Sequence, residues 1–283
     1  MPELPEVQAH AERLTERFGG AELTSFSPLS FSVLKTVLPV SDVCGLPLDL
    51  VARRGKLLLL RFGPTGADGS ITFVVHLMQG GRLVPDDKQS SKPRNGMARW
   101  TFADGRALLL TEAGKERKAG VWVVNGDPLG QPPLAGLGVD ADTVTRTQLD
   151  VALRAKNQRL HGFLRDQHGV AGLGRMLANE ICHTARLSPF VMTSKLSGDD
   201  VDRLESAIHE RIASALDHER TLDAMSKSAD RPGAVHRRKG ATCPVCGDEV
   251  RAVEYNAYEV DYCATCQTGG KVLADNTTSK FLK

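Results

Sequence analysis

Apolar side chains near the start of the chain recur at steps of three and four residues. They are Leu4, Val7, Ala11, Leu14 and Phe18. Residues with this spacing lie on one face of an α-helix, and the pair Gly19-Gly20 directly after them is a helix-ending signal. The pattern therefore predicts a helix from Glu3 to Phe18 that buries one face.

Short apolar runs follow this helix, and many of their residues are β-branched or aromatic, as is typical of strands. The runs cover residues 56–62, 71–77, 98–102, 106–111 and 121–124. Ala103-Asp104-Gly105 stands between two of them as a hairpin turn. We expect a mainly antiparallel β-sandwich or barrel after the N-terminal helix.

The second half of the chain has a helical pattern. It is preceded by a segment from Gly126 to Gly138 with three prolines and four glycines, which marks a linker. Thr145-x-x-Gln148 resembles a capping box that opens a helix, and Ser197-x-x-Asp200 is a similar start signal. An apolar stripe with helical spacing then runs along Val201, Leu204, Ile208, Ile212 and Ala215. The predicted fold class is therefore α+β.

The composition is that of an ordinary globular protein, because 41% of the 283 residues are hydrophobic and 25% are charged. No segment reaches the roughly 20 apolar residues that a membrane-spanning helix needs. The acidic start Met-Pro-Glu-Leu-Pro-Glu does not resemble a secretion signal. We expect a cytoplasmic protein.

The formal net charge of +2 argues neither for nor against a polyanionic partner. The distribution of charge is more informative, because one short segment is rich in basic residues and holds a single acid, Asp230. The basic residues are Lys227, Arg231, Arg237, Arg238 and Lys239. Such a cluster is a candidate phosphate-binding surface, and a solvated linker is the alternative interpretation.

Four of the six cysteines form two C-x-x-C pairs that are 16 residues apart, Cys243 with Cys246 and Cys263 with Cys266. Two such pairs supply the four thiolates of a tetrahedral Zn²⁺ site. With four protein ligands the zinc ion has no open position, so its role is structural. Two disulfides or a redox pair are the alternatives, although disulfides are unusual in a cytosolic protein.

The segments between the two cysteine pairs, 249–255 and 258–262, predict a β-hairpin with Asn256-Ala257 near its turn. Together with the cysteines this is the pattern of a zinc ribbon. The remaining two cysteines, Cys44 and Cys182, stand alone, and we expect both to be buried as small apolar residues.

The segment Pro2-Glu3-Leu4-Pro5-Glu6 has two interpretations. Proline and acidic residues suit a first helical turn, so the segment can be purely structural. If Met1 is removed, Pro2 becomes a secondary amine with a pKa of about 7.7 to 8.0, and its neutral form can attack an electrophilic carbon. The positive end of the helix favours the neutral amine, whereas Glu3 and Glu6 favour the cation. Glu3, next to the amine, is placed to act as a general acid.

Four motifs in this order resemble the formamidopyrimidine-DNA glycosylase / endonuclease VIII family. The first is the start, MPELPEV, and the second is Arg53-Arg54-Gly55-Lys56 leading into an apolar strand. The third is the glycine-rich segment 170–174 followed by Ala178-Asn179-Glu180, which resembles the helix–two-turns–helix element of the family. The zinc ribbon is the fourth. The resemblance spans nearly the whole chain.

The resemblance implies four parts of the chain. They are an N-terminal catalytic β-sandwich domain with its helix (1–125), a linker (126–144), a helix–two-turns–helix domain (145–235) and a zinc-ribbon finger with a C-terminal tail (236–283). It also implies a monomer associated with the nucleoid, whose partner is double-stranded DNA with a damaged base or an abasic site.

By the same resemblance, the chain is a bifunctional DNA glycosylase and abasic-site lyase of base excision repair that removes oxidised bases. The damaged nucleotide is flipped out of the duplex, because its sugar carbon is unreachable within the stack. Pro2 would attack the sugar C1′ and form an imine, and β-elimination follows. Glu3 would supply a proton for ring opening, and Lys56 would contact phosphate and assist later proton transfers. The resemblance implies no cofactor besides one structural Zn²⁺.

Several positions that would contact DNA differ from the family. Tyr258 and Glu259 stand where the family ribbon has Gly-Arg, and a carboxylate there repels phosphate. Lys271 and Lys280 are candidate substitutes for this arginine, which is thought to assist δ-elimination. Arg175 stands where the glycine-rich turn of the family ends in asparagine, and an arginine there suits a phosphate.

Two further segments resemble the family's DNA-reading loops. His76-Leu77-Met78-Gln79-Gly80-Gly81 resembles the strand and loop that fill the gap left by the flipped base, with Gln79 where formamidopyrimidine enzymes tend to have methionine. The partner segment 111–120 lacks the usual Arg-Phe-Gly, and Arg117 or Lys118 is the candidate to probe the opposite strand. The preferred lesion therefore does not follow from the sequence.

Two alternative functions stay open on the sequence. One is an abasic-site lyase with weak or specialised base excision. The other is a DNA lesion-binding protein without excision, which the altered reading loops favour. Pro2, Glu3 and Lys56 argue against a pure binder, because binding needs no amine nucleophile. A zinc-ribbon protein for another kind of partner is a third interpretation, and it leaves the other three motifs unexplained.

Overall fold

The computed structural model of the chain describes residues 1–36, 43–64, 69–114, 116–227, 229–255 and 258–273. It divides into two compact units. Unit 1 is Met1–Gly136 with Asp223–Ser228, and unit 2 is Leu137–Leu222 with Ala229–Lys283. The main division falls inside the segment 126–144, while the boundaries expected for the four parts stay predictions.

Unit 1 begins with helix α1 (Leu4–Phe18), which confirms the predicted helix. Glu3 and Glu6 form a capping box in which the backbone N–H of Glu3 donates to the Glu6 carboxylate (2.5 Å). This box satisfies orphan donors at the start of the helix. The apolar face of α1, with Val7, Leu14 and Phe18, packs into the core of unit 1.

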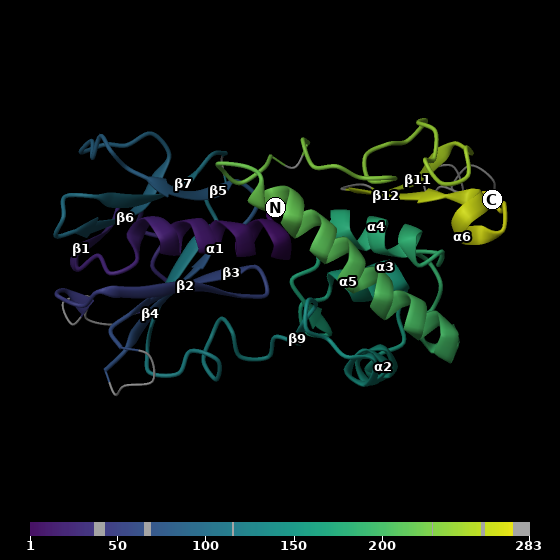
Figure 1. Cartoon of the computed structure of the whole chain (residues 1–283), viewed down its shortest axis with the longest axis horizontal. Helices are drawn as coiled ribbons and strands as arrows, with labels where there is room; N and C mark the ends of the chain where they lie inside the picture. Colours follow the sequence, from purple (N-terminus) through teal and green to yellow (C-terminus); the bar gives the residue numbers. More distant parts are fainter. Residues whose placement is uncertain (37–42, 65–68, 115, 228, 256–257, 274–283) are drawn as a thin grey trace. The chain divides into compact units, whose positions relative to one another are not determined.

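Two antiparallel sheets of four strands make up the rest of unit 1 (Figure 1). The first has the order β1 (Leu23–Pro28), β6 (Gly96–Phe102), β7 (Ala107–Glu112) and β5 (Gly81–Pro85). The second has the order β2 (Leu48–Arg54), β3 (Leu57–Phe62), β4 (Ile71–His76) and β8 (Gly120–Asn125). Phe26, Phe73 and Trp100 meet between them with ring centroids 4.9 to 5.7 Å apart. The expected β-sandwich is confirmed.

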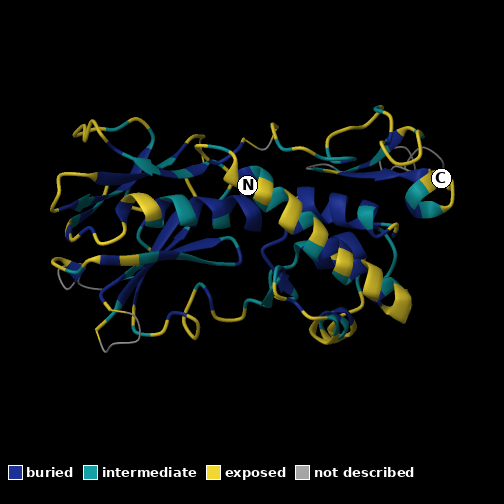
Figure 2. Ribbon diagram, in the orientation of Figure 1, coloured by how far each residue is buried: buried dark blue, intermediate teal, exposed yellow. Residues whose placement is uncertain are grey.

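Unit 2 contains a helical part and the ribbon. The helices are α2 (Arg146–Ala155), α3 (Leu160–Arg165), α4 (Arg175–Thr184) and α5 (Gly198–Arg220), with the 3-10 turn η2 (Thr193–Lys195) and the short parallel pair β9 (Val139–Asp140) and β10 (Val170–Ala171). The ribbon consists of β11 (Val250–Tyr255), β12 (Tyr258–Cys263) and α6 (Ala264–Thr268). Figure 2 shows α4 buried along most of its length and α5 exposed along its outer face.

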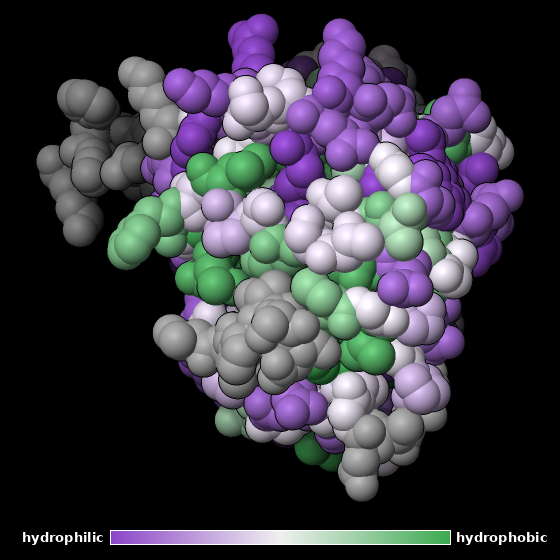
Figure 3. All heavy atoms as spheres, turned by 90° about the vertical axis from the view of Figure 1, so that its left-hand side faces the viewer, coloured by the Kyte–Doolittle hydropathy of each residue, from purple (hydrophilic) through white to green (hydrophobic). Residues whose placement is uncertain are grey.

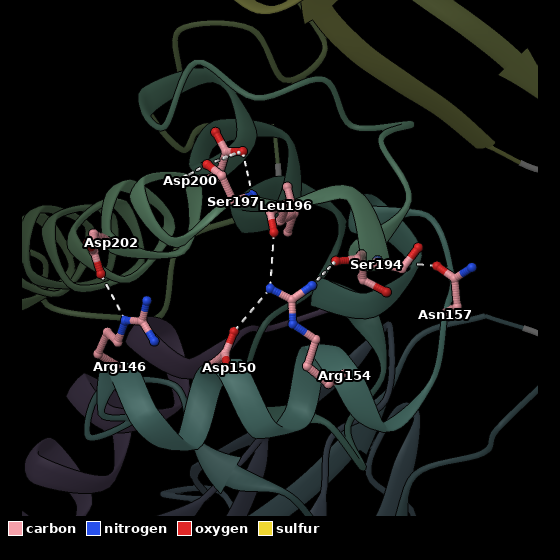
Figure 4. A network of polar contacts seen from close by, with 10 residues as sticks. Arg146, Asp150, Arg154, Asn157, Ser194, Leu196, Ser197, Asp200 and Asp202 are labelled. Carbon is pink, nitrogen blue, oxygen red and sulfur yellow. Dashed lines mark hydrogen bonds and ion pairs between the residues drawn. The ribbon is translucent and has the colours of Figure 1, made fainter.

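Both capping boxes that the sequence predicts in unit 2 are present, at Thr145 before α2 and at Ser197 before α5. Around the second box, polar contacts join α2 to the start of α5 (Figure 4). Arg154 of α2 donates to the backbone carbonyl of Leu196 (3.0 Å), and Arg146 pairs with Asp202 of α5 (2.9 Å). These contacts fix two helices of unit 2 against each other.

One prediction about the lone cysteines is wrong. Cys182 is buried as expected, and burial raises the pKa of its thiol, which keeps it inert. Cys44 is exposed instead of buried, because it lies in the loop segment before β2 and not in an element of the core. The predicted ribbon turn Asn256-Ala257 and the candidate Lys280 lie outside the described residues.

The surface of unit 1 carries scattered apolar residues. Phe31 is the most exposed large apolar residue of the described chain, at 106%, followed in unit 1 by Leu129 at 52%. Figure 3 looks at the molecule from the left-hand side of Figure 1, and the coloured atoms on this face show hydrophilic and hydrophobic residues interspersed. Within the described part of the chain, no helix is both long and apolar enough to span a bilayer.

Candidate functional site

The start of α1 and the turn between β2 and β3 lie at the same end of unit 1. Thr15 of α1 bonds through its hydroxyl to the backbone of Val51 in β2 (2.8 and 3.2 Å). About two turns closer to the N-terminus of α1, Gln8 accepts a hydrogen bond from Arg53 Nε of β2 (3.1 Å). Contacts closer to the N-terminus of α1 are therefore made with residues closer to the C-terminal end of β2. Pro2 and the turn that holds Lys56 lie beyond these contacts in the same direction.

Pro2 and Glu3 are both buried at this end, and Glu3 is 4% exposed. Lys56 is partly exposed in the tight turn Gly55-Lys56, where Gly55 has a φ of 56° that favours glycine. The structure thus brings the start of the chain and Lys56, which are 54 positions apart, to one end of unit 1.

His76 joins this end at the close of β4, where it pairs with Leu57, the residue after Lys56. Burial, followed by the charge of Lys56, lowers the pKa of His76 from 6.5 to about 4. The ring is therefore neutral at physiological pH. Its Nδ1 accepts the backbone N–H of Met78 (3.0 Å), which leaves the ring proton on Nε2 as a donor.

The two segments that resemble reading loops lie side by side. His76 pairs with Gly120 across β4 and β8, and Gly81 pairs with Glu112 across β5 and β7. A Cβ on Gly80 would lie 2.6 Å from the backbone oxygen of Ala113, so the two loops approach at a glycine.

Each of these two loops contains a residue other than glycine in the left-handed region, Met78 with a φ of 52° and Arg117 with a φ of 42°. Such conformations are sparsely populated and are enriched at functional sites. Gln79 and Arg117 are both exposed, and Lys118 pairs with Glu116 (2.7 Å). Of the two cations proposed to probe the opposite strand, Arg117 has no ion pair with a described residue.

Sequence reasoning missed the residue that closes the second loop. Glu112 is 5% exposed, and its carboxylate accepts the backbone N–H of Ala119 (2.6 Å). A buried carboxylate held by a backbone donor fixes the two ends of the loop together. No local pattern marks Glu112, because its partner lies seven residues away across an irregular segment.

In unit 2, Arg175 is the first residue of α4 and is exposed. The preceding glycine-rich turn is held by Gln167, which accepts from Gly172 N (3.0 Å) and donates to the carbonyl of Leu173 (2.9 Å). The N-terminus of a helix favours anions, so Arg175 and the start of α4 are arranged to bind one.

Helix α4 is also tied to the chain that enters the ribbon. The Glu180 carboxylate, 1% exposed, accepts the backbone N–H groups of Ala234, Val235 and His236 at 2.8 to 3.0 Å. Asn179 donates to Asp261 of β12 (2.9 Å), and Asp261 also accepts from the backbone of Arg237 (2.9 Å). The carboxylates of Glu180 and Asp261 therefore hold α4, the segment before the ribbon and the ribbon itself together through hydrogen bonds.

The four ribbon cysteines converge between the two knuckles. Cys243 Sγ lies 3.9 Å from Cys266 Sγ, and Cys246 Sγ lies 3.4 Å from Cys263 Sγ. A tetrahedral zinc ion with Zn–S bonds of about 2.3 Å would separate its sulfurs by about 3.8 Å. The donor set and its spacing therefore fit a four-thiolate metal site, and no disulfide joins the described cysteines.

His183 of α4 was not anticipated at this site. Its Nε2 lies 3.3 Å from Cys243 Sγ, and it belongs with three of the cysteines to a group whose ligand atoms all lie within 4.8 Å of one another. A ring N–H that points at a thiolate is an outer-shell partner of the kind that orients metal ligands. His183 lies in the last turn of α4, and no sequence pattern pairs it with the ribbon.

The comparisons with known proteins agree on one family. Residues 1–121 match the family model described as formamidopyrimidine-DNA glycosylase N-terminal domain. A formamidopyrimidine-DNA glycosylase-like protein of Mycobacterium tuberculosis, itself uncharacterised, is 41% identical over 160 residues, which are 54% of this chain and 99% of that protein. The formamidopyrimidine-DNA glycosylase of Pelotomaculum thermopropionicum is 29% identical over 282 residues, 94% of this chain and 99% of that enzyme.

Solved structures agree on the fold. MutM (Fpg) of Thermus thermophilus matches with a TM-score of 0.79 and 25% identity, over 96% of this chain and 100% of that one. Lactococcus lactis Fpg in complex with abasic-site DNA matches with a TM-score of 0.81 and 21% identity, over 94% of this chain and 99% of that one. The fold of the chain is therefore that of these proteins.

Proposed function

The chain belongs to the formamidopyrimidine-DNA glycosylase family, and from this membership we propose that it is a DNA glycosylase of base excision repair that also cleaves abasic sites. Its substrate is double-stranded DNA with an oxidised base or an abasic site. The observation that carries the proposal is the shared location of Pro2, Glu3 and Lys56 at one end of unit 1, inside the segment 1–121 that matches the family.

The proposed reaction uses the nitrogen of Pro2 after removal of Met1. The amine attacks C1′ of the flipped nucleotide, the bond between C1′ and the base breaks, and the base leaves with a proton. Opening of the sugar ring, with a proton delivered to the ring oxygen, gives a cationic imine (an iminium ion) between the secondary amine of Pro2 and C1′. The imine acidifies the hydrogens on C2′, and loss of one of them expels the 3′ phosphate by β-elimination.

Other side chains at this end serve the same steps. Glu3 protonates the sugar ring oxygen as the ring opens, because it is adjacent to the amine. Lys56 holds a phosphate and assists later proton transfers. His76, which is neutral with its proton on Nε2, donates a hydrogen bond to the DNA near Lys56. A neutral donor avoids adding a second cation beside the lysine.

Further contacts to DNA come from both units. Gln79 and Arg117, exposed on adjacent loops, reach the base pair at the lesion and the opposite strand. Arg175 at the start of α4 binds a phosphate through its guanidinium and the helix N-terminus. One Zn²⁺ held by Cys243, Cys246, Cys263 and Cys266 keeps the ribbon folded and supplies no catalytic ligand position.

The nucleophile is tested by borohydride trapping on a duplex with an abasic site. Pro2→Gly, or a chain that retains Met1 through an N-terminal extension, should lose imine trapping yet keep much of its affinity for the duplex. The same extension placed at the C-terminus is the matched control and should trap normally. Trapping by the altered chains at the level of the control would exclude Pro2 as the nucleophile.

A second candidate function is favoured by the two reading loops, which carry Gln79 and Arg117 in place of the residues typical of the family. It is an abasic-site lyase, or a lesion-binding protein, with little or no base excision. The lyase would trap on abasic DNA alone, and the binding protein would bind without trapping.

A further inference from the structure

The tip of the ribbon hairpin carries two tyrosines. Tyr255 at the end of β11 and Tyr258 at the start of β12 are directly opposite each other. Directly opposite side chains of an antiparallel pair project from the same face. Their rings are stacked, with centroids 4.8 Å apart and an interplanar angle of 13°.

Two arginines from the ends of α3 contact these two tyrosines. Arg165, the last residue of α3, places its guanidinium carbon 4.7 Å from the centroid of Tyr258. Arg159, which precedes α3, donates to the Tyr255 hydroxyl (3.0 Å) and lies 5.5 Å from the Phe190 centroid. Aromatic faces attract guanidinium groups and restrict their rotamers, so both cations are held in place.

Among the described residues, neither arginine forms an ion pair with a carboxylate; Arg159 is exposed and Arg165 partly so. His161 stacks on Tyr258 at 6.5 Å, and burial, together with the charge of Arg165, lowers the pKa of His161 to about 3. The histidine is therefore neutral and adds no charge.

The acid beside Tyr258 lies on the other side of the hairpin. Glu259 pairs with Glu254, and successive side chains of a strand point to opposite faces. Glu259 therefore shares a face with Glu254, whose carboxylate pairs with Lys239. The Glu259 side chain therefore points away from the face that bears the two tyrosines.

We propose that Arg159 and Arg165, held by the Tyr255–Tyr258 pair, form a binding site for a phosphate of the DNA backbone at the ribbon tip. The inference rests on the proposed DNA-binding function. Stacking leaves the N–H edge of a guanidinium available, and its fork matches two phosphate oxygens. Because the tyrosines hold the arginines in advance, binding costs little additional side-chain entropy.

The test is the salt dependence of affinity for a duplex that contains a tetrahydrofuran abasic analogue, measured by fluorescence anisotropy. Arg159→Gln and Arg165→Gln should each lower affinity about tenfold and reduce the slope of log K against log salt by roughly 1. Lys88→Gln, which removes one exposed lysine charge from unit 1, is the matched control and should change the slope far less.

Tyrosine variants test whether binding depends on the rings that position the two arginines and not on the arginine charges alone. Tyr258→Ala should weaken binding although both arginines remain, whereas Tyr258→Phe, which keeps the ring, should lose much less. Zinc content is measured for every variant, so that a collapsed ribbon is recognised. Arg165→Lys should retain the slope and lose part of the affinity, because an ammonium lacks the planar fork.

Two results would overturn the inference, and they are distinguishable. Wild-type slopes for both glutamine variants, in a protein that binds and traps abasic DNA, would refute the arginine site and leave the proposed function standing. Failure of the wild-type chain to bind or trap abasic DNA would refute the proposed function and the arginine site together.

Discussion

At the scale of single residues, His76 shows how burial sets a protonation state that a sequence does not display. The sequence places it on a strand beside a reading loop, but its low pKa depends on burial and on the charge of Lys56, the residue directly before β3. Met78, with its left-handed backbone, supplies the N–H that fixes the ring tautomer. These features arise from tertiary contacts, so only the residue's position was predictable.

The lowered pKa of His76 makes stability depend on pH. Because its folded pKa of about 4 lies below the ordinary value of 6.5, the unfolded chain binds more protons between these values. The stabilisation from neutral His76 is complete above pH 6.5 and is lost as the pH falls toward 4. From about pH 7.5 to about pH 5 the loss is about 2 kcal/mol.

Urea unfolding at both pH values measures this effect against His76→Gln, which cannot titrate. The wild-type free energy of unfolding should fall by about 2 kcal/mol more than that of the variant. His10 and His161, whose pKa values are also lowered by burial, are common to both chains and cancel. Equal falls in the two chains would show that His76 is not buried in its neutral form.

At the scale of elements, strong local patterns were predictive, whereas three of the four edge strands of the two sheets in unit 1 were not predicted. The helix α1, the two capping boxes and the ribbon strands follow from spacing alone. The strands β1, β2 and β5 were missed, and each lies at the edge of its sheet. An edge strand buries less of its surface and carries more polar residues, so its alternation is weak.

The prediction at the scale of elements concerns the binding of zinc by the ribbon. Cys243→Ser should lose one equivalent of bound zinc and weaken DNA affinity, because a structural zinc site contributes directly to the folding of its element. Cys44→Ser, which alters an exposed cysteine outside the cluster, should keep both. Metal analysis of the purified variants measures the loss, and unchanged zinc in Cys243→Ser would refute the four-thiolate site.

At the scale of the whole molecule, the proposed chemistry lies in unit 1, whereas Arg175 and the ribbon lie in unit 2. The order of the motifs predicted both parts, but it did not predict that the chain returns to unit 1 after α5. Residues Asp223–Ser228 return to unit 1, where Met225 packs into the core. One methionine in a short polar segment gives no periodic signal, so sequence reasoning assigned the segment to the helical part.

Excision of damaged bases through the Pro2 amine is tested by borohydride trapping on two duplexes. One duplex carries an abasic site and the other an oxidised base, and the protein is the processed chain without Met1. We expect a covalent adduct on both duplexes. An adduct on the abasic duplex alone would contradict excision of that base and leave a lyase, and no adduct on either duplex would contradict the amine mechanism itself.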